Sequence, residues 1–227
     1  MTRTLLAALA ASALASAAHA DGVAEISTPS QPGSETATIA WQDADTLRID
    51  TPDPAGYMLI RDGNAYAVTD QPGMGLMVVD LAAIMTMARG MAAAGGMDTP
   101  SLDEHRAAAV ERITATGTRE TVAGLEGEVY EIVWTDAAGD SHTDTAVLSG
   151  DALAREFTAA FAAFAQASGT EPDARSVELH DRGLGILRYG DDFTLVSISG
   201  DAPGADHFEL PAEPMTMQDM MRGRMPD

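Results

Sequence analysis

The 227-residue sequence contains no cysteine, and it also lacks lysine, so its thirteen basic residues are all arginine. Without cysteine the chain has no disulfide bond, no thiol chemistry and no N-terminal cysteine that could carry a lipid. Aspartate and glutamate number 35, which gives a formal net charge of −22 at pH 7. A surface this anionic repels phosphate, so nucleic acid is excluded as a partner.

The first twenty residues have the composition of a secretory signal. Arg3 gives a positive start, residues 5–18 are almost entirely apolar, and Ala18-His19-Ala20 places small residues beside a cleavage point. The apolar run of 14 residues is shorter than the roughly 20 that a membrane-spanning helix needs. We predict a cleavable signal peptide over residues 1–20 and an exported, periplasmic protein without a lipid anchor; secretion is the alternative.

Composition divides the remaining chain into three parts. Residues 21–34 contain Pro29, Pro32 and Gly33 among small polar residues, which predicts a flexible lead-in. Residues 35–212 carry regular hydrophobic patterns, which predict one folded domain. Residues 213–227 are rich in methionine and predict a separate tail.

Alternation of apolar and polar residues, the signature of half-buried strands, dominates the predicted domain. It predicts ten strands, with residues 118–123 as a possible eleventh, and Asp62-Gly63 predicts a tight hairpin turn. The ten predicted strands are 35–41, 46–51, 57–62, 64–69, 75–79, 110–116, 128–135, 142–148, 184–189 and 193–199.

Two stretches have helical spacing instead. Asp80 is a suitable N-cap for a helix that ends at Gly95-Gly96, and a second predicted helix starts near Asp151 and ends at Ser168-Gly169. Strands and helices do not alternate along the chain, which argues against a parallel sheet. We predict an α+β fold of mostly sequential antiparallel strands with two inserted helices.

No residues form a recognised catalytic or metal-binding motif. The histidines after the signal include no pair at the helical spacing of zinc sites, and no serine lies in a Gly-x-Ser-x-Gly elbow. Asp140, His142 and Asp144 alternate along a predicted strand, which we interpret as a polar hairpin arm facing water. We therefore predict a protein that is not an enzyme and that has no cofactor.

Methionine is the one unusually common residue, with 13 copies, several of them in the tail. Thioether sulfur binds Cu(I), so Met217, Met220 and Met221 offer a copper site as one alternative. Methionine is also an adaptable apolar side chain. In that interpretation, which we favour, the tail is a short amphipathic segment that docks on the domain or on a partner.

Aromatic side chains supply a candidate binding surface for an apolar or amphipathic ligand, such as a lipid or acyl group. The candidate ligand-binding residues, on predicted strand faces and along the second predicted helix, are Trp41, Tyr57, Trp134, Phe157, Phe161 and Phe164. The alternative is that these side chains simply fill the core. A second hypothesis is an envelope protein that binds a partner protein through its sheet edge or its methionine-rich tail.

Several short motifs add a family resemblance. They are Asp62-Gly63-Asn64-x-Tyr66, Asp80-Leu81, Val122-Ala123-Gly124 followed by Tyr130, and Phe208-x-x-Pro211 before the methionine-rich tail. With the order of elements, they resemble the exported bacterial families that share the fold of periplasmic lipoprotein carriers and their outer-membrane receptors, many of them domains of unknown function. The resemblance implies an incomplete, half barrel of antiparallel strands whose open side is covered by two helices. It also implies an apolar cavity between sheet and helices, where such carriers hold acyl chains.

Overall fold

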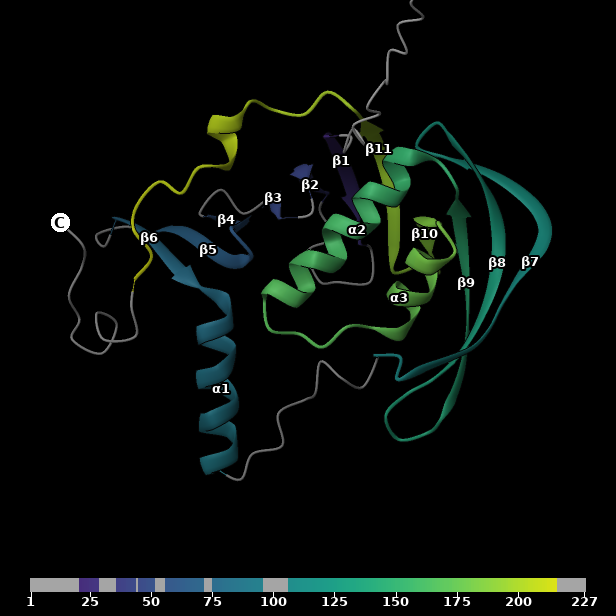
Figure 1. Ribbon diagram of the computed structural model, residues 1–227, viewed down its shortest axis with the longest axis horizontal. Helices are drawn as coiled ribbons and strands as arrows, with labels where there is room; N and C mark the ends of the chain where they lie inside the picture. Colours follow the sequence, from purple (N-terminus) through teal and green to yellow (C-terminus); the bar gives the residue numbers. More distant parts are fainter. Residues whose placement is uncertain are drawn as a thin grey trace, which may run out of the picture.

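The computed structural model describes residues 21–28, 36–43, 45–51, 56–71, 75–95 and 106–215. Within these ranges the chain forms one open antiparallel sheet of eleven strands and three α-helices (Figure 1). The predicted α+β class and the antiparallel arrangement are therefore confirmed. The predicted signal peptide and residues 216–227 of the methionine-rich tail lie outside the described residues.

The strands follow one another across the sheet almost in chain order. The order is β6-β5-β4-β3-β2-β1-β11-β10-β9-β8-β7, so the first and last strands pair with each other in the middle. The strands are β1 (Gly22–Ser27), β2 (Ala37–Asp43), β3 (Thr46–Asp50), β4 (Gly56–Arg61), β5 (Asn64–Gln71), β6 (Gly75–Asp80), β7 (Ala109–Val122), β8 (Leu125–Thr135), β9 (Ser141–Ser149), β10 (Gly185–Tyr189) and β11 (Phe193–Ser199).

The central strand β1 lies in the segment predicted to be a flexible lead-in, so that prediction for residues 21–34 is wrong over Gly22–Ser27. β1 pairs with β2 on one side and with β11 on the other. Its buried and half-buried residues alternate, with Ala24 and Ile26 pointing into the core. Pro29 and Pro32 follow this strand closely, and their presence in the same window masked its short alternation.

The possible eleventh strand predicted at residues 118–123 is instead the second half of β7. β7 pairs with β8 along its length, from Ala109 opposite Thr135 to Val122 opposite Leu125. The register shifts between Ala115 and Arg119, where Gly117 has a φ of 80°. A glycine in this conformation is typical of a bulge, which explains why the alternation breaks in mid-strand.

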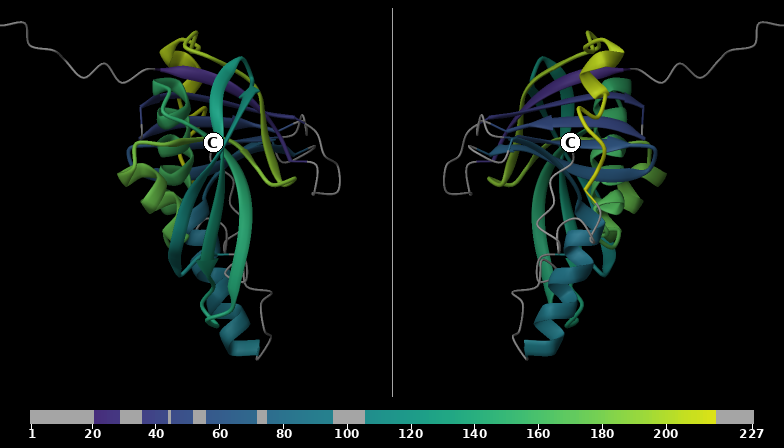
Figure 2. Two further views of the ribbon diagram at one scale, coloured as in Figure 1. Left: turned by 90° about the vertical axis from the view of Figure 1, so that its right-hand side faces the viewer. Right: turned by 90° about the vertical axis from the view of Figure 1, so that its left-hand side faces the viewer.

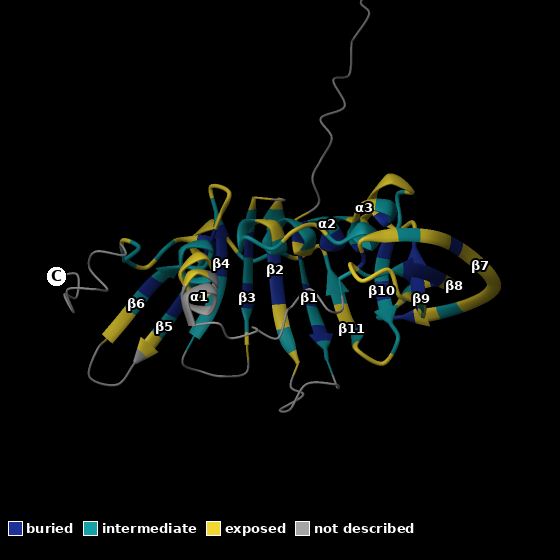
Figure 3. Cartoon of the chain, turned by 90° about the horizontal axis from the view of Figure 1, so that it is seen from below, coloured by how far each residue is buried: buried dark blue, intermediate teal, exposed yellow. Residues whose placement is uncertain are grey.

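The helices α1 (Leu81–Gly95) and α2 (Ala152–Ala167) agree with the two predicted helices, whereas α3 (Ala174–Asp181) was not predicted. α2 lies across one face of the sheet (Figures 1 and 3). α3 has eight residues, of which only Leu179 is buried. A helix this short carries too little hydrophobic periodicity for its sequence to reveal it.

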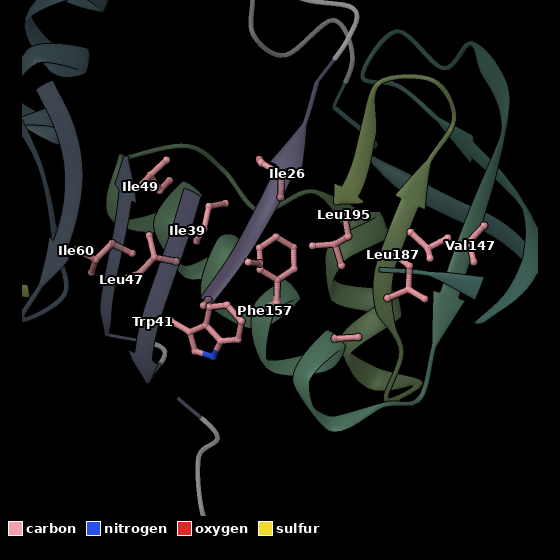
Figure 4. Packing of buried hydrophobic residues seen from close by; sticks show 14 residues of the cluster. Ile26, Ile39, Trp41, Leu47, Ile49, Ile60, Val147, Phe157, Leu187 and Leu195 are labelled. Carbon is pink, nitrogen blue, oxygen red and sulfur yellow. The ribbon is translucent and has the colours of Figure 1, made fainter. Parts of the chain in front are cut away.

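The main core lies between α2 and the sheet (Figure 4). Its buried residues are Ala24, Ile26, Ile39, Trp41, Leu47, Ile49, Ile60, Val122, Val147, Ala154, Phe157, Ala160, Leu187 and Leu195. The ring centroids of Trp41 on β2 and Phe157 on α2 lie 5.8 Å apart in an edge-to-face arrangement. This contact places one of the two tryptophans of the sheet directly beneath the helix.

A second hydrophobic group, the α3 cluster, lies beside the main core. Its buried residues are Ala107, Ile113, Ile132, Trp134, Ala146, Leu148 and Leu179. Neighbouring residues of β9 alternate between the two groups: Val147 belongs to the main core, and Ala146 and Leu148 belong to the α3 cluster. The two faces of β9 are therefore both buried, which accounts for its unbroken apolar run.

The C-terminal segment packs on the face of the sheet opposite α2. Here Phe208 of the short 3-10 helix η1 (Ala205–Phe208) contacts Ala40 and Leu59, which alternate with main-core residues along β2 and β4. Arg48 and Arg61 donate hydrogen bonds to the carbonyl oxygens of His207 and Phe208, at 3.1 and 3.0 Å. These two arginines hold the segment against the strands.

The helix α1 extends away from the sheet (Figures 1 and 2). It contacts β5 and β6 of the sheet. No residue from Leu81 to Ala88 is buried, although all of them except Thr86 are apolar. None of the helices in the described ranges has the length and hydropathy that a membrane crossing requires.

Candidate functional site

The N-terminal half of α2 is anchored firmly to the sheet. The Asp151 carboxylate caps the helix by accepting a hydrogen bond from the Leu153 amide at 2.9 Å. Further along, the hydroxyl of buried Thr158 donates to the Ala154 carbonyl and accepts from the Ile186 amide of β10, both at 2.9 Å. One hydroxyl thus ties the helix backbone to the strand backbone.

The C-terminal half of the same helix is less well buried. All the buried residues of α2 fall between Ala154 and Ala160, and none of residues 161–167 is buried. Phe161 is 44% exposed, although its ring stacks on that of Phe157 at a centroid distance of 6.4 Å. The apolar stripe of the helix therefore continues past the point where the sheet covers it.

Three of the six predicted ligand-binding residues meet in the main core, and a fourth lies at its margin. Trp41 and Phe157 are almost completely buried there, and Phe164 is half-buried against the same cluster. Phe161 is the fourth, stacked on Phe157 but open to solvent on its other side.

The other two predicted residues do not share this site, so the prediction of one common lining is wrong for Tyr57 and Trp134. Tyr57 packs on the opposite face of the sheet, where the Arg48 guanidinium lies 3.6 Å from its ring centroid. Burial raises the pKa of the Tyr57 hydroxyl. Trp134 belongs to the α3 cluster. Both assignments failed because the two faces of each strand carry large side chains.

A hollow opens at the less buried end of α2, next to the hairpin turn between β4 and β5. It has a volume of about 260 Å³. Its lining residues are Asp45, Ile60, Gly63, Ala163, Gln166 and Ala167. This volume falls just below the ~300–1,000 Å³ of typical ligand pockets, and most of the lining is small or apolar. Nearby, the end of α2 meets α1: a Cβ atom placed on Gly169 would lie 3.8 Å from the Cβ of Ala82.

A polar cluster, unforeseen from the sequence, joins α3 to the sheet around Arg175. The guanidinium donates to the Asp173 carboxylate at 2.6 and 2.9 Å, to Asp144 at 3.3 Å and to the Tyr189 hydroxyl at 2.9 Å. It also lies 4.2 Å from the centroid of the Trp134 ring. Arg175 comes from α3, whereas three of its partners come from β8, β9 and β10, so the cluster fastens the helix to the strands.

The Asp144 carboxylate is the centre of this polar cluster. Its Oδ2 atom accepts hydrogen bonds from Trp134 Nε1, from the Tyr189 hydroxyl and from Arg175. Three donors converge on this one oxygen, so the Asp144 carboxylate joins side chains of α3, β8 and β10 to β9. The prediction of a water-facing polar arm is wrong for Asp144, because α3 covers this part of the strand.

His142 extends the cluster toward solvent. Its ring stacks on Trp134 at a centroid distance of 4.3 Å, and its Nε2 lies 3.0 Å from Oδ2 of Asp136. This hydrogen bond, with further bonds from the backbone of Asp140 and Ala138, lowers the pKa of the Asp136 carboxyl. The pair closes the turn between β8 and β9.

Ionisation of the cluster is set by burial and by Arg175. Burial alone would raise the pKa of Asp173, but its hydrogen bonds to Arg175 and the attraction of that cation outweigh burial and lower it. Burial, followed by the hydrogen bond to Asp144, raises the pKa of the Tyr189 hydroxyl, which therefore stays a neutral donor. Within the described part of the chain, no buried side-chain nitrogen or oxygen lacks a hydrogen bond.

The lowered pKa of Asp173 predicts a pH-dependent contribution to stability. A depressed carboxyl pKa stabilises the fold above the unfolded-state value of about 4, and this stabilisation is lost as the pH falls through the folded-state value. We expect Asp173→Asn, which keeps an acceptor for the helix cap, to cost about 1–2 kcal/mol at pH 7. Urea unfolding at pH 7 and pH 3 measures the effect; an equal cost at both pH values would contradict it.

Comparison of the chain with protein-family models, with curated proteins and with solved structures finds no match. The described residues include no group of three or more histidine, aspartate or glutamate side chains arranged to hold a metal ion. The methionines proposed as copper ligands, Met217, Met220 and Met221, lie outside the described residues. The candidate sites are therefore the Arg175 cluster and the α2 seam, the space between the C-terminal half of α2 and strands β3–β5 that includes the hollow.

Proposed function

We propose that this chain is an exported, non-catalytic binding module for an apolar or amphipathic ligand, such as a lipid or acyl group. In this proposal the open sheet works as a half barrel, and the ligand enters between the C-terminal half of α2 and strands β3–β5. The observation that carries it is the poorly buried C-terminal half of α2: its apolar stripe leaves the core at Phe161, and its Ala163 and Ala167 line the 260 Å³ hollow. The family resemblance of the sequence motifs supports the same function.

The uneven burial of α2 supports the proposed entry route. Thr158 and the residues around it fix the first half of the helix, whereas residues 161–167 bury no side chain. A segment with few buried contacts opens at a lower free energy than a well-packed one. A small outward movement of this half would enlarge the hollow and join it to the main-core side chains Phe157 and Phe164.

The polar parts of the molecule favour binding over catalysis. In the Arg175 cluster, three donors hold the Asp144 carboxylate and four hold the Asp173 carboxylate. The hollow itself is lined by one carboxylate, Asp45, without a histidine or a hydroxyl nucleophile among its lining residues. Acyl transfer or hydrolysis needs a nucleophile beside a base, and the hollow provides no such pair.

The test is lipid binding by the mature protein with Phe161 replaced. Native mass spectrometry of protein from its own cell envelope is expected to show a co-purifying lipid, and delipidated protein is expected to bind fluorescently labelled palmitate. Burying one phenylalanine side chain is worth about 1.5–3 kcal/mol, so Phe161→Gln is expected to weaken binding about tenfold or more.

Val177→Gln is the matched control, because Val177 lies on α3 and is 49% exposed, close to the 44% of Phe161. This variant is expected to bind the labelled palmitate as the parent protein does. Absence of any bound lipid together with no palmitate binding would refute the proposal. Equal loss of binding in both variants would also refute it, because the effect would then not come from the α2 seam.

A second candidate function is protein recognition through the edge strand β6. β6 lies at one end of the sheet, where Met215 bridges its end at Val79. Nearer its start β6 exposes Leu76, which is 41% accessible, and its sequence carries no charge before Asp80. An uncharged edge strand is a template for pairing with another chain. In this case an envelope protein, and not a lipid, co-purifies with the chain.

A further inference from the structure

α1 is an apolar helix whose described residues lack a covering partner of matching size. Leu81, Ile84 and Met85 are only half-buried, and Met87 is 41% exposed. Only Thr86 and Arg89 of α1 are polar, and a helix with so much apolar surface normally lies inside a protein or against a partner. Figures 1 and 2 show instead that α1 extends beyond the sheet. Some apolar segment is needed to cover it.

The chain's own C-terminal segment starts at the base of this helix. Met215 forms a parallel bridge with Val79, and its amide donates to the Val78 carbonyl at 2.8 Å. Because the bridge is parallel, the described chain at Met215 runs in the same direction as β6. β6 ends at Asp80 and α1 begins at Leu81, so this direction leads toward α1.

The residues after Met215 have the right length and pattern to cover α1. Residues 216–227 span ~18 Å as a helix, and the 15 residues of α1 span ~22 Å. Met217, Met220 and Met221 recur at the i, i+3, i+4 spacing of a single helical face. Methionine side chains adapt well to an irregular apolar surface, and α1 presents methionines of its own.

We infer that residues 216–227 dock on α1, with their methionines against its exposed apolar residues. The inference rests on the Met215 bridge and on the exposure of α1, and it holds whether or not the α2 seam binds a lipid. It assigns the methionine-rich tail a partner within the same chain. It also explains why an apolar helix tolerates a position outside the sheet.

Cross-linking tests this directly, because the natural chain has no cysteine to interfere. The double variant Met87→Cys/Met221→Cys, treated with a short bis-maleimide at low protein concentration, is expected to give a cross-link within one chain in most molecules. The control pair Val177→Cys/Met221→Cys, with a similarly exposed residue on α3, is expected to give none. Cross-linked dimers from the first pair, no cross-link, or equal cross-linking in both pairs would overturn the inference.

A second measurement does not depend on the introduced cysteines. Deleting residues 216–227 is expected to speed hydrogen exchange of the α1 amides at least about tenfold while leaving exchange in α2 unchanged. Unchanged exchange in α1 would overturn the inference. Faster exchange across the whole sheet would also overturn it, because the tail would then stabilise the fold in general and not cover α1.

Discussion

Replacing Arg175 with alanine is expected to lower the free energy of unfolding by about 3 kcal/mol. The substitution leaves two carboxylates, Asp144 and Asp173, close together without their shared cation. Removing one partner of a buried ion pair costs roughly 3–5 kcal/mol. The lower end of this range applies because the Arg175 side chain is still 16% exposed to solvent. Thermal unfolding is expected to shift down by about 6–12 °C.

Arg112→Ala is the matched control for Arg175→Ala. Arg112 forms an ion pair with Glu131 at 3.0 Å, but both side chains are about half exposed, at 58% and 48%. An exposed pair of this kind contributes about 0–1 kcal/mol. Similar unfolding temperatures for the two variants would contradict the argument that the Arg175 cluster fastens α3 to the sheet.

Replacing Gly185 with alanine is expected to cost about 3 kcal/mol, for a steric reason. Gly185 begins β10 directly beneath the first turn of α2, and a Cβ atom there would lie 2.2 Å from the backbone carbonyl of Ala154. Neither backbone can yield without moving the helix off the strand, and overpacking of this kind costs roughly 1–3 kcal/mol or more. Urea unfolding followed by circular dichroism measures the loss.

Gly150→Ala separates this clash from the general effect of removing a glycine. Gly150 lies just before α2, and a Cβ atom there would meet nothing within 4 Å. An alanine in such a place usually changes stability by less than ~1 kcal/mol, often favourably. If both variants unfold at the same denaturant concentration, close packing of α2 on β10 is not the cause of the stability loss in Gly185→Ala.

Most of the sheet could be predicted from sequence because its strands carry a local signal. In β3, for example, Leu47 and Ile49 alternate with polar residues, and the structure buries these two side chains beneath α2. β1 was missed because its alternation is short and lies among prolines and glycine. α3 was missed because its position depends on contacts between Arg175 and distant strands, which no local pattern encodes.

The candidate site could be predicted only in part, and the limit was the choice of strand face. The stripe of Phe157 and Phe164 on α2 follows from helical spacing alone. Tyr57 lies in the run Tyr57-Met58-Leu59-Ile60, where every residue is apolar or aromatic, so alternation cannot say which side faces the helix. That choice is made by pairing: Ile60 lies opposite Leu47 and joins it in the main core, which turns Tyr57 to the other side.

The pairing of β1 with β11 has a consequence for how the molecule acquires its fold. The N-terminal six strands end in an unpaired edge until β11 is available, so the middle of the sheet closes only after all eleven described strands have been made. Contacts between residues this far apart in the chain slow folding. The nascent polypeptide therefore stays open for longer than one built from local hairpins.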